Sequence, residues 1–123
     1  MNKEFIPYEQ ALELRNLGFD EECLGYWNDV EQAVPYLGIR RISLSDTQGG
    51  YFKLAPLYQQ AFRWFREKYD LDSSIALLPK GYGFYIHENR NYTNRGESYG
   101  VLTYEEAELE CLKKLIEIIK RKS

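Results

Sequence analysis

The chain has 123 residues, of which 44% are hydrophobic, 15% aromatic and 28% charged. This composition excludes an intrinsically disordered chain and a membrane-spanning one, and the length predicts a single domain over residues 1–123. Sixteen basic against nineteen acidic residues give a net charge of -3, which excludes the strongly positive field expected of a duplex-binding protein.

The first predicted element is a helix over about Pro7 to Leu17. Proline suits the first turn of a helix, and Gly18 stands where a left-handed residue commonly ends one. The polar stripe of this helix is narrow, which predicts that most of its surface is covered. The residues before it lack the apolar run of a signal peptide, so we expect a cytoplasmic protein.

Alternating apolar residues predict two strands next, Cys23 to Trp27 and Tyr36 to Leu44. The adjacent Arg40 and Arg41 interrupt the alternation of the second strand, which indicates a bulge or a strand end. The polar segment 46–50 contains glycines and is typical of a connection.

The middle of the chain predicts an amphipathic helix that begins at Pro56 and ends at Tyr69. Its core-facing side chains recur at helical spacing, and they are Leu57, Tyr58, Ala61, Phe62, Phe65 and Tyr69. Trp64 falls at the boundary of this stripe, where an indole can pack its ring and keep its N–H in water.

Short strands are predicted again at Ile75–Leu78, Tyr82–His87 and Ser98–Leu102, with a polar loop over 88–97. The segment 70–74 resembles the opening of a calcium-binding loop. It lacks that loop's glycine and closing glutamate, so a turn that ends the helix is the simpler interpretation.

The last predicted element is a helix from Thr103 to about Arg121. Thr103 and Glu106 have the spacing of a capping box. One wide apolar face follows, made by Ala107, Cys111, Leu112, Leu115, Ile118 and Ile119. Acidic residues concentrate in the first half and basic residues in the second, as the helix dipole favours.

Together these elements predict an α+β fold, with a mainly antiparallel sheet of four to five short strands packed against two to three helices. The phrase Tyr-x-(Gln/Glu)-Ala stands at the start of each helix, at Tyr8, Tyr58 and Tyr104. Two interpretations are open: a duplicated α-β-β unit, or sequence that is merely favourable at the start of a helix.

The residues that commonly carry catalysis are sparse. Cys23 and Cys111 are too far apart to suggest a metal knuckle, and we expect both to be buried, reduced thiols. His87 is the only histidine, and no second group is tied to it by spacing. We therefore predict a protein that is not an enzyme and holds no cofactor or metal. A small hydrolase around His87 is the third alternative.

Two surfaces are candidates for binding. Arg63, Trp64 and Arg66 combine charge and an aromatic ring on one side of the middle helix, and with Arg40 and Arg41 they suit a single-stranded nucleic acid. An ordinary solvated helix face explains the same pattern.

The second surface follows from the eleven tyrosines of the chain. Tyrosine is an amphipathic interface anchor, and six of these residues fall on predicted strands or loops: Tyr26, Tyr36, Tyr51, Tyr85, Tyr92 and Tyr99. A half-exposed sheet accommodates the same set without any partner, so both interpretations are open.

Three stretches carry a resemblance to known proteins: FIPYEQAL at 5–12, LAPLYQQAFRWFREKY at 54–69 and TYEEAELECL at 103–112. They resemble a group of small uncharacterised proteins of gut bacteria, their phages and their integrated mobile elements. The resemblance implies a mobile-element setting, where small acidic proteins often bind other proteins. It implies no activity, cofactor or catalytic residue, and the segment 28–52 is longer and less regular than that group leads one to expect.

The expected function is accordingly a non-enzymatic protein-interaction module of a phage or mobile element, with another protein as partner and no membrane. The alternative is a single-stranded nucleic-acid-binding protein that uses the basic and aromatic helix face.

Overall fold

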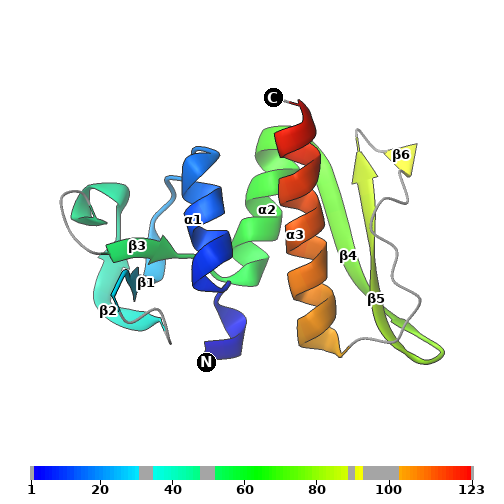
Figure 1. Ribbon diagram of the computed structural model, residues 1–123, viewed down its shortest axis with the longest axis horizontal. Coiled ribbons are helices and arrows are strands. Elements are labelled where there is room, and N and C mark those ends of the chain that lie inside the picture. Colours follow the sequence, from blue (N-terminus) through cyan, green and yellow to red (C-terminus); the bar gives the residue numbers. More distant parts are fainter. Residues whose placement is uncertain (1, 31–34, 48–51, 89–90, 93–102, 123) are drawn as a thin grey trace. The chain divides into compact units, whose positions relative to one another are not determined.

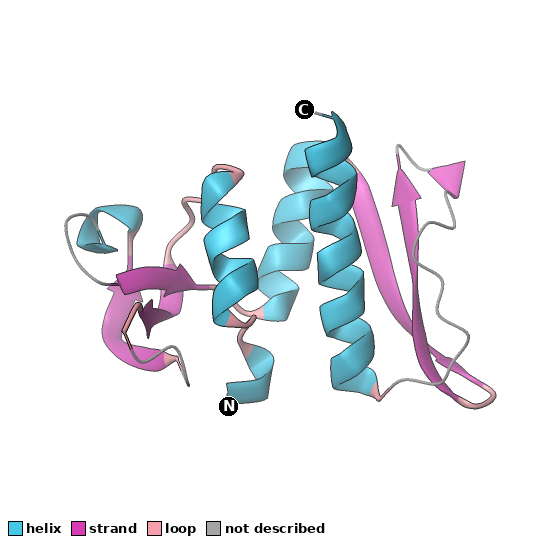
Figure 2. Ribbon diagram, viewed as in Figure 1, coloured by secondary structure: helices cyan, strands magenta, loops and turns pink. Residues whose placement is uncertain are grey.

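The computed structural model describes residues 2–30, 35–47, 52–88, 91–92 and 103–122. The chain divides into two compact units, Met1–Tyr58 and Gln59–Ser123, and each is described by itself. Helices and antiparallel strands occur in both (Figures 1 and 2), so the predicted α+β class is confirmed. Within these described ranges the strands form two sheets of three strands each, where the sequence predicted one larger sheet. The single domain expected from the length stays a prediction.

The described residues of the first unit form one α-helix, two short 3-10 helices and a three-stranded sheet. Its elements are η1 (Asn2–Glu4), α1 (Tyr8–Asn16), β1 (Cys23–Asn28), β2 (Tyr36–Ile42), η2 (Leu44–Thr47) and β3 (Phe52–Ala55).

Helix α1 ends as the sequence predicts. Gly18 has a φ of 101°, which a residue without a Cβ adopts at little cost. The amide of Phe19 donates to the Leu14 carbonyl over 2.9 Å, which satisfies one of the last free carbonyls of the helix. Helix α1 packs against β3.

Strand β1 is the central strand of the sheet, with β2 and β3 antiparallel to it on either side. The register between β1 and β2 changes from Cys23 opposite Ile42 to Gly25 opposite Leu37. Residues 38–41 of β2 therefore lie opposite Leu24 alone, which confirms the bulge predicted from Arg40 and Arg41.

The prediction missed β3, which runs from Phe52 to Ala55. Four residues with Lys53 among them give no recognisable alternation, and Pro56 follows at once. This strand exists because β1 offers it an antiparallel partner, which no local pattern reveals.

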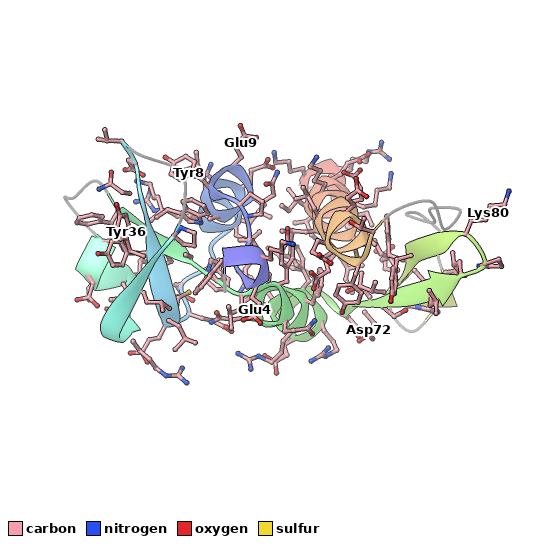
Figure 3. The ribbon with its side chains drawn as sticks, turned by 90° about the horizontal axis from the view of Figure 1, so that it is seen from below. Glu4, Tyr8, Glu9, Tyr36, Asp72 and Lys80 are labelled. Atoms are coloured by element: carbon pink, nitrogen blue, oxygen red, sulfur yellow. The ribbon has the colours of Figure 1, made fainter. Side chains whose placement is uncertain are left out.

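The second unit contains two long helices and the other sheet. Its elements are α2 (Tyr58–Tyr69), β4 (Leu71–Leu78), β5 (Gly81–Glu88), β6 (Asn91–Tyr92) and α3 (Tyr104–Lys122), and α2 begins at the last residue of the first unit. The strands lie in the order β4-β5-β6, and the hairpin of β4 and β5 carries Lys80 at its tip (Figure 3).

Two predictions in this unit were wrong. Segment 70–74 is not a turn, because Asp70 alone reverses the chain with a φ of 54° and β4 begins at Leu71. The polar loop at 88–97 contains the two-residue strand β6, paired with β5 through His87 opposite Tyr92. The strand predicted at 98–102 lies outside the described residues.

Helix α3 begins with the predicted capping box. The Glu106 amide donates to the Thr103 hydroxyl over 3.1 Å, and the Thr103 amide donates to the Glu106 carboxylate over 2.8 Å. The predicted apolar face is buried and packs on β4 and β5 (Figure 1), and an ion pair joins Lys122 to Glu88 of β5. One acidic residue, Glu108, lies on the buried side.

No helix among the described residues is both long and apolar enough to cross a membrane.

Replacing Leu115 with alanine tests the apolar face of α3. Leu115 is fully buried, so we expect Leu115→Ala to lower the free energy of unfolding by about 2–5 kcal/mol, from lost apolar contact and the cavity left behind. Urea titration followed by circular dichroism measures the change. The exposed Lys113→Ala, two residues away, is the control and should change stability by less than about 0.5 kcal/mol. Equal effects of the two variants would show that the face does not form a core.

Candidate functional site

The basic and aromatic face predicted on α2 lacks its aromatic part. Arg63 and Arg66 are exposed, but only 5% of the surface of Trp64 is exposed to solvent. Its ring meets those of Phe65 and Tyr69 edge-on, at centroid distances of 5.1 and 5.4 Å, and the Lys68 ammonium lies 5.0 Å from its centroid. The prediction of a partly solvent-exposed Trp64 indole was therefore wrong. Position 64 lies close enough to the core-facing stripe for its large ring to be buried.

The remaining predicted residues do not complete that face. Arg66 lies 3.9 Å from the carboxylate of Asp72, on β4. Arg41 is exposed in the β2 bulge, and Arg40 occupies the same bulge. These two belong to the first unit, and Arg63 and Arg66 belong to the second.

Tyr85 lies on β5, opposite Ser74 of β4. The register puts His87 opposite Asp72 on this same side of the hairpin, since paired residues and every second residue share a face. The four side chains are neighbours on one polar face. Tyr85 and His87 are both half-buried there.

Metal binding has no support in the part of the chain that the structure describes. Within it, no cluster of three or more histidine, cysteine, aspartate and glutamate side chains is arranged to hold an ion.

Both cysteines are buried and neither is in a disulfide, as predicted. The Cys23 thiol donates to the Glu21 carbonyl over 3.4 Å. Burial raises the pKa of the Cys111 thiol to about 12, and a hydrogen bond with Ser73 offsets part of this effect. A thiol of that kind is not a nucleophile at neutral pH, because the thiolate is the reactive form.

The most distinctive surface lies on the sheet of the first unit. Alternation along β1 turns Cys23 and Trp27 inward and Leu24 and Tyr26 to the other side. Strand pairing extends that second side on to the two neighbouring strands. We call it the aromatic face, and its residues are Leu24, Tyr26, Asn28, Tyr36, Phe52 and the buried Leu54.

Three rings of the aromatic face contact one another. Tyr26 stacks on Tyr36 at a centroid distance of 5.5 Å and an interplanar angle of 19°, and it meets Phe52 edge-on at 5.0 Å and 76°. Tyr36, labelled in Figure 3, and Phe52 are each 36% exposed, and Leu24 is 43% exposed. Aromatic and apolar surface is thus open to solvent on all three strands.

On the opposite side of the same sheet the region around Trp27 is covered, whereas Leu37, paired with Gly25, is 57% exposed. The Trp27 indole donates to the Ile6 carbonyl over 3.1 Å, and Tyr8 meets the Trp27 ring edge-on at 6.1 Å. The Tyr8 hydroxyl donates to Asp29 over 2.9 Å, and Lys53 pairs with the same carboxylate at 2.7 Å. Burial raises the pKa of Tyr8, and the bond to Asp29 raises it further.

Close packing at the centre of β1 adds to this rigidity. A Cβ on Gly25 would lie 2.7 Å from the Tyr36 carbonyl and about 3.1 Å from the Phe5 ring. Only glycine allows β2 and Phe5 to approach so closely. The sheet that carries the aromatic face is therefore held rigid by the contacts of Trp27 and Gly25 on its other side.

Sequence reasoning found part of this face. Tyr26 and Tyr36 were among the six candidate anchor tyrosines. Phe52 was missed with its strand, and Leu24 was missed because one exposed leucine in a strand carries no signal by itself. Of the other anchors, Tyr51 and Tyr99 lie outside the described residues, and Tyr92 is described by its backbone only.

Comparison with protein-family models, with curated proteins and with solved structures finds no match to this chain.

The Cys111 thiol gives a test of this description. A pKa raised from 9.0 to about 12 keeps the thiol protonated in the folded state, so its contribution to stability is complete below pH 9 and is lost as the pH rises toward 12. In Cys23→Ser protein, which isolates Cys111, we expect no reaction with a disulfide reagent at pH 8 until urea unfolds the chain. Rapid labelling of the folded protein would contradict the burial of Cys111.

Proposed function

We propose that this chain is a non-enzymatic protein-interaction module of a phage or mobile element and that it binds its partner through the aromatic face. The exposed cluster of Tyr26, Tyr36 and Phe52 is the observation that carries the proposal. The setting comes from the resemblance in the three helix stretches. The proposal keeps the cytoplasmic location expected from the sequence.

The composition of the aromatic face supports a protein partner. Tyrosine and phenylalanine offer a large apolar area at a small entropic cost, and such rings at the centre of an interface carry much of its binding energy. The three contacting rings are uncharged, and the β2 bulge opposite Leu24 carries the two arginines Arg40 and Arg41. An uncharged centre is what a protein interface requires, because an unpaired charge would lose its hydration there.

The nucleic-acid alternative has weaker support. Single-strand binders stack bases on open aromatic rings beside cations, and the ring proposed for that role on α2, Trp64, is buried. On the aromatic face, one side of the Tyr26 ring is already occupied by Tyr36. The net charge of -3 opposes binding to phosphates.

A photo-crosslinking experiment tests the proposal. With the photoreactive amino acid benzoyl-phenylalanine in place of Tyr36, we expect irradiation of host cells to attach one defined protein, because position 36 lies within the proposed interface. The same amino acid in place of Leu77, which is 73% exposed in the other unit, is the matched control and should not attach that protein.

A second variant makes this result specific. Adding Phe52→Ala to the crosslinking protein should reduce the yield by an order of magnitude, since the edge contact on Tyr26 is lost. Identical products at positions 36 and 77, or a crosslink to nucleic acid, would count against the proposal.

The arginines of α2 test the alternative. Both are exposed, so the double change Arg63→Glu with Arg66→Glu should cost less than about 1 kcal/mol of stability. We expect neither the parent nor the double variant to bind a fluorescent single strand at near-physiological salt. Micromolar binding by the parent that weakens as salt rises and disappears in the double variant would favour the alternative.

A further inference from the structure

We draw no further inference here: the strongest candidate, the polar side-chain cluster that Asp72, Ser74, Tyr85 and His87 form on one face of the β4 and β5 hairpin, carries none, because nothing in the described part of the chain shows what covers that face or what it binds.

Discussion

The burial of Trp27 is the constraint on which the first unit depends. Its indole N–H is satisfied by the Ile6 carbonyl, and its ring takes the edge of Tyr8. Once this side chain is fixed inward, the two-residue period of a strand turns Tyr26 and Asn28 outward. A shift of one residue in β1 would bury Tyr26 and Asn28 and expose the indole. The same packing that forms the core therefore determines which rings face solvent.

Local sequence patterns predicted the features whose cause is local. The capping box of Thr103 and Glu106, the left-handed Gly18 and the bulge at the paired arginines each depend on residues that are close in the chain. Strand β3 depends instead on a pairing with β1 from more than twenty residues away. The start of β4 was missed because Asp70 adopts a left-handed conformation that few residues other than glycine adopt.

The candidate site divides in the same way. Composition and period alone made the tyrosines at strand positions candidate interface anchors, and Tyr26 and Tyr36 were among them. Whether a ring is exposed to solvent depends on which other residues pack over it. For that reason the exposure of Trp64 was predicted wrongly. The cluster itself could not be predicted, because Phe52 reaches Tyr26 only through the pairing of β3 with β1. Exposure and clustering are tertiary properties, whereas residue type and spacing are local.

The bulge in β2 has a consequence for how this chain tolerates changes in length. Residues 38–41 lie opposite Leu24 alone, so this stretch already carries surplus residues that the ladder does not use. Tyr36 and Leu37 keep their register on one side of it, and Ile42 keeps its own on the other. Related chains can therefore gain or lose a residue here without rotating a single ring of the sheet. Insertions and deletions during evolution should accumulate at this point before they appear elsewhere in β1 or β2.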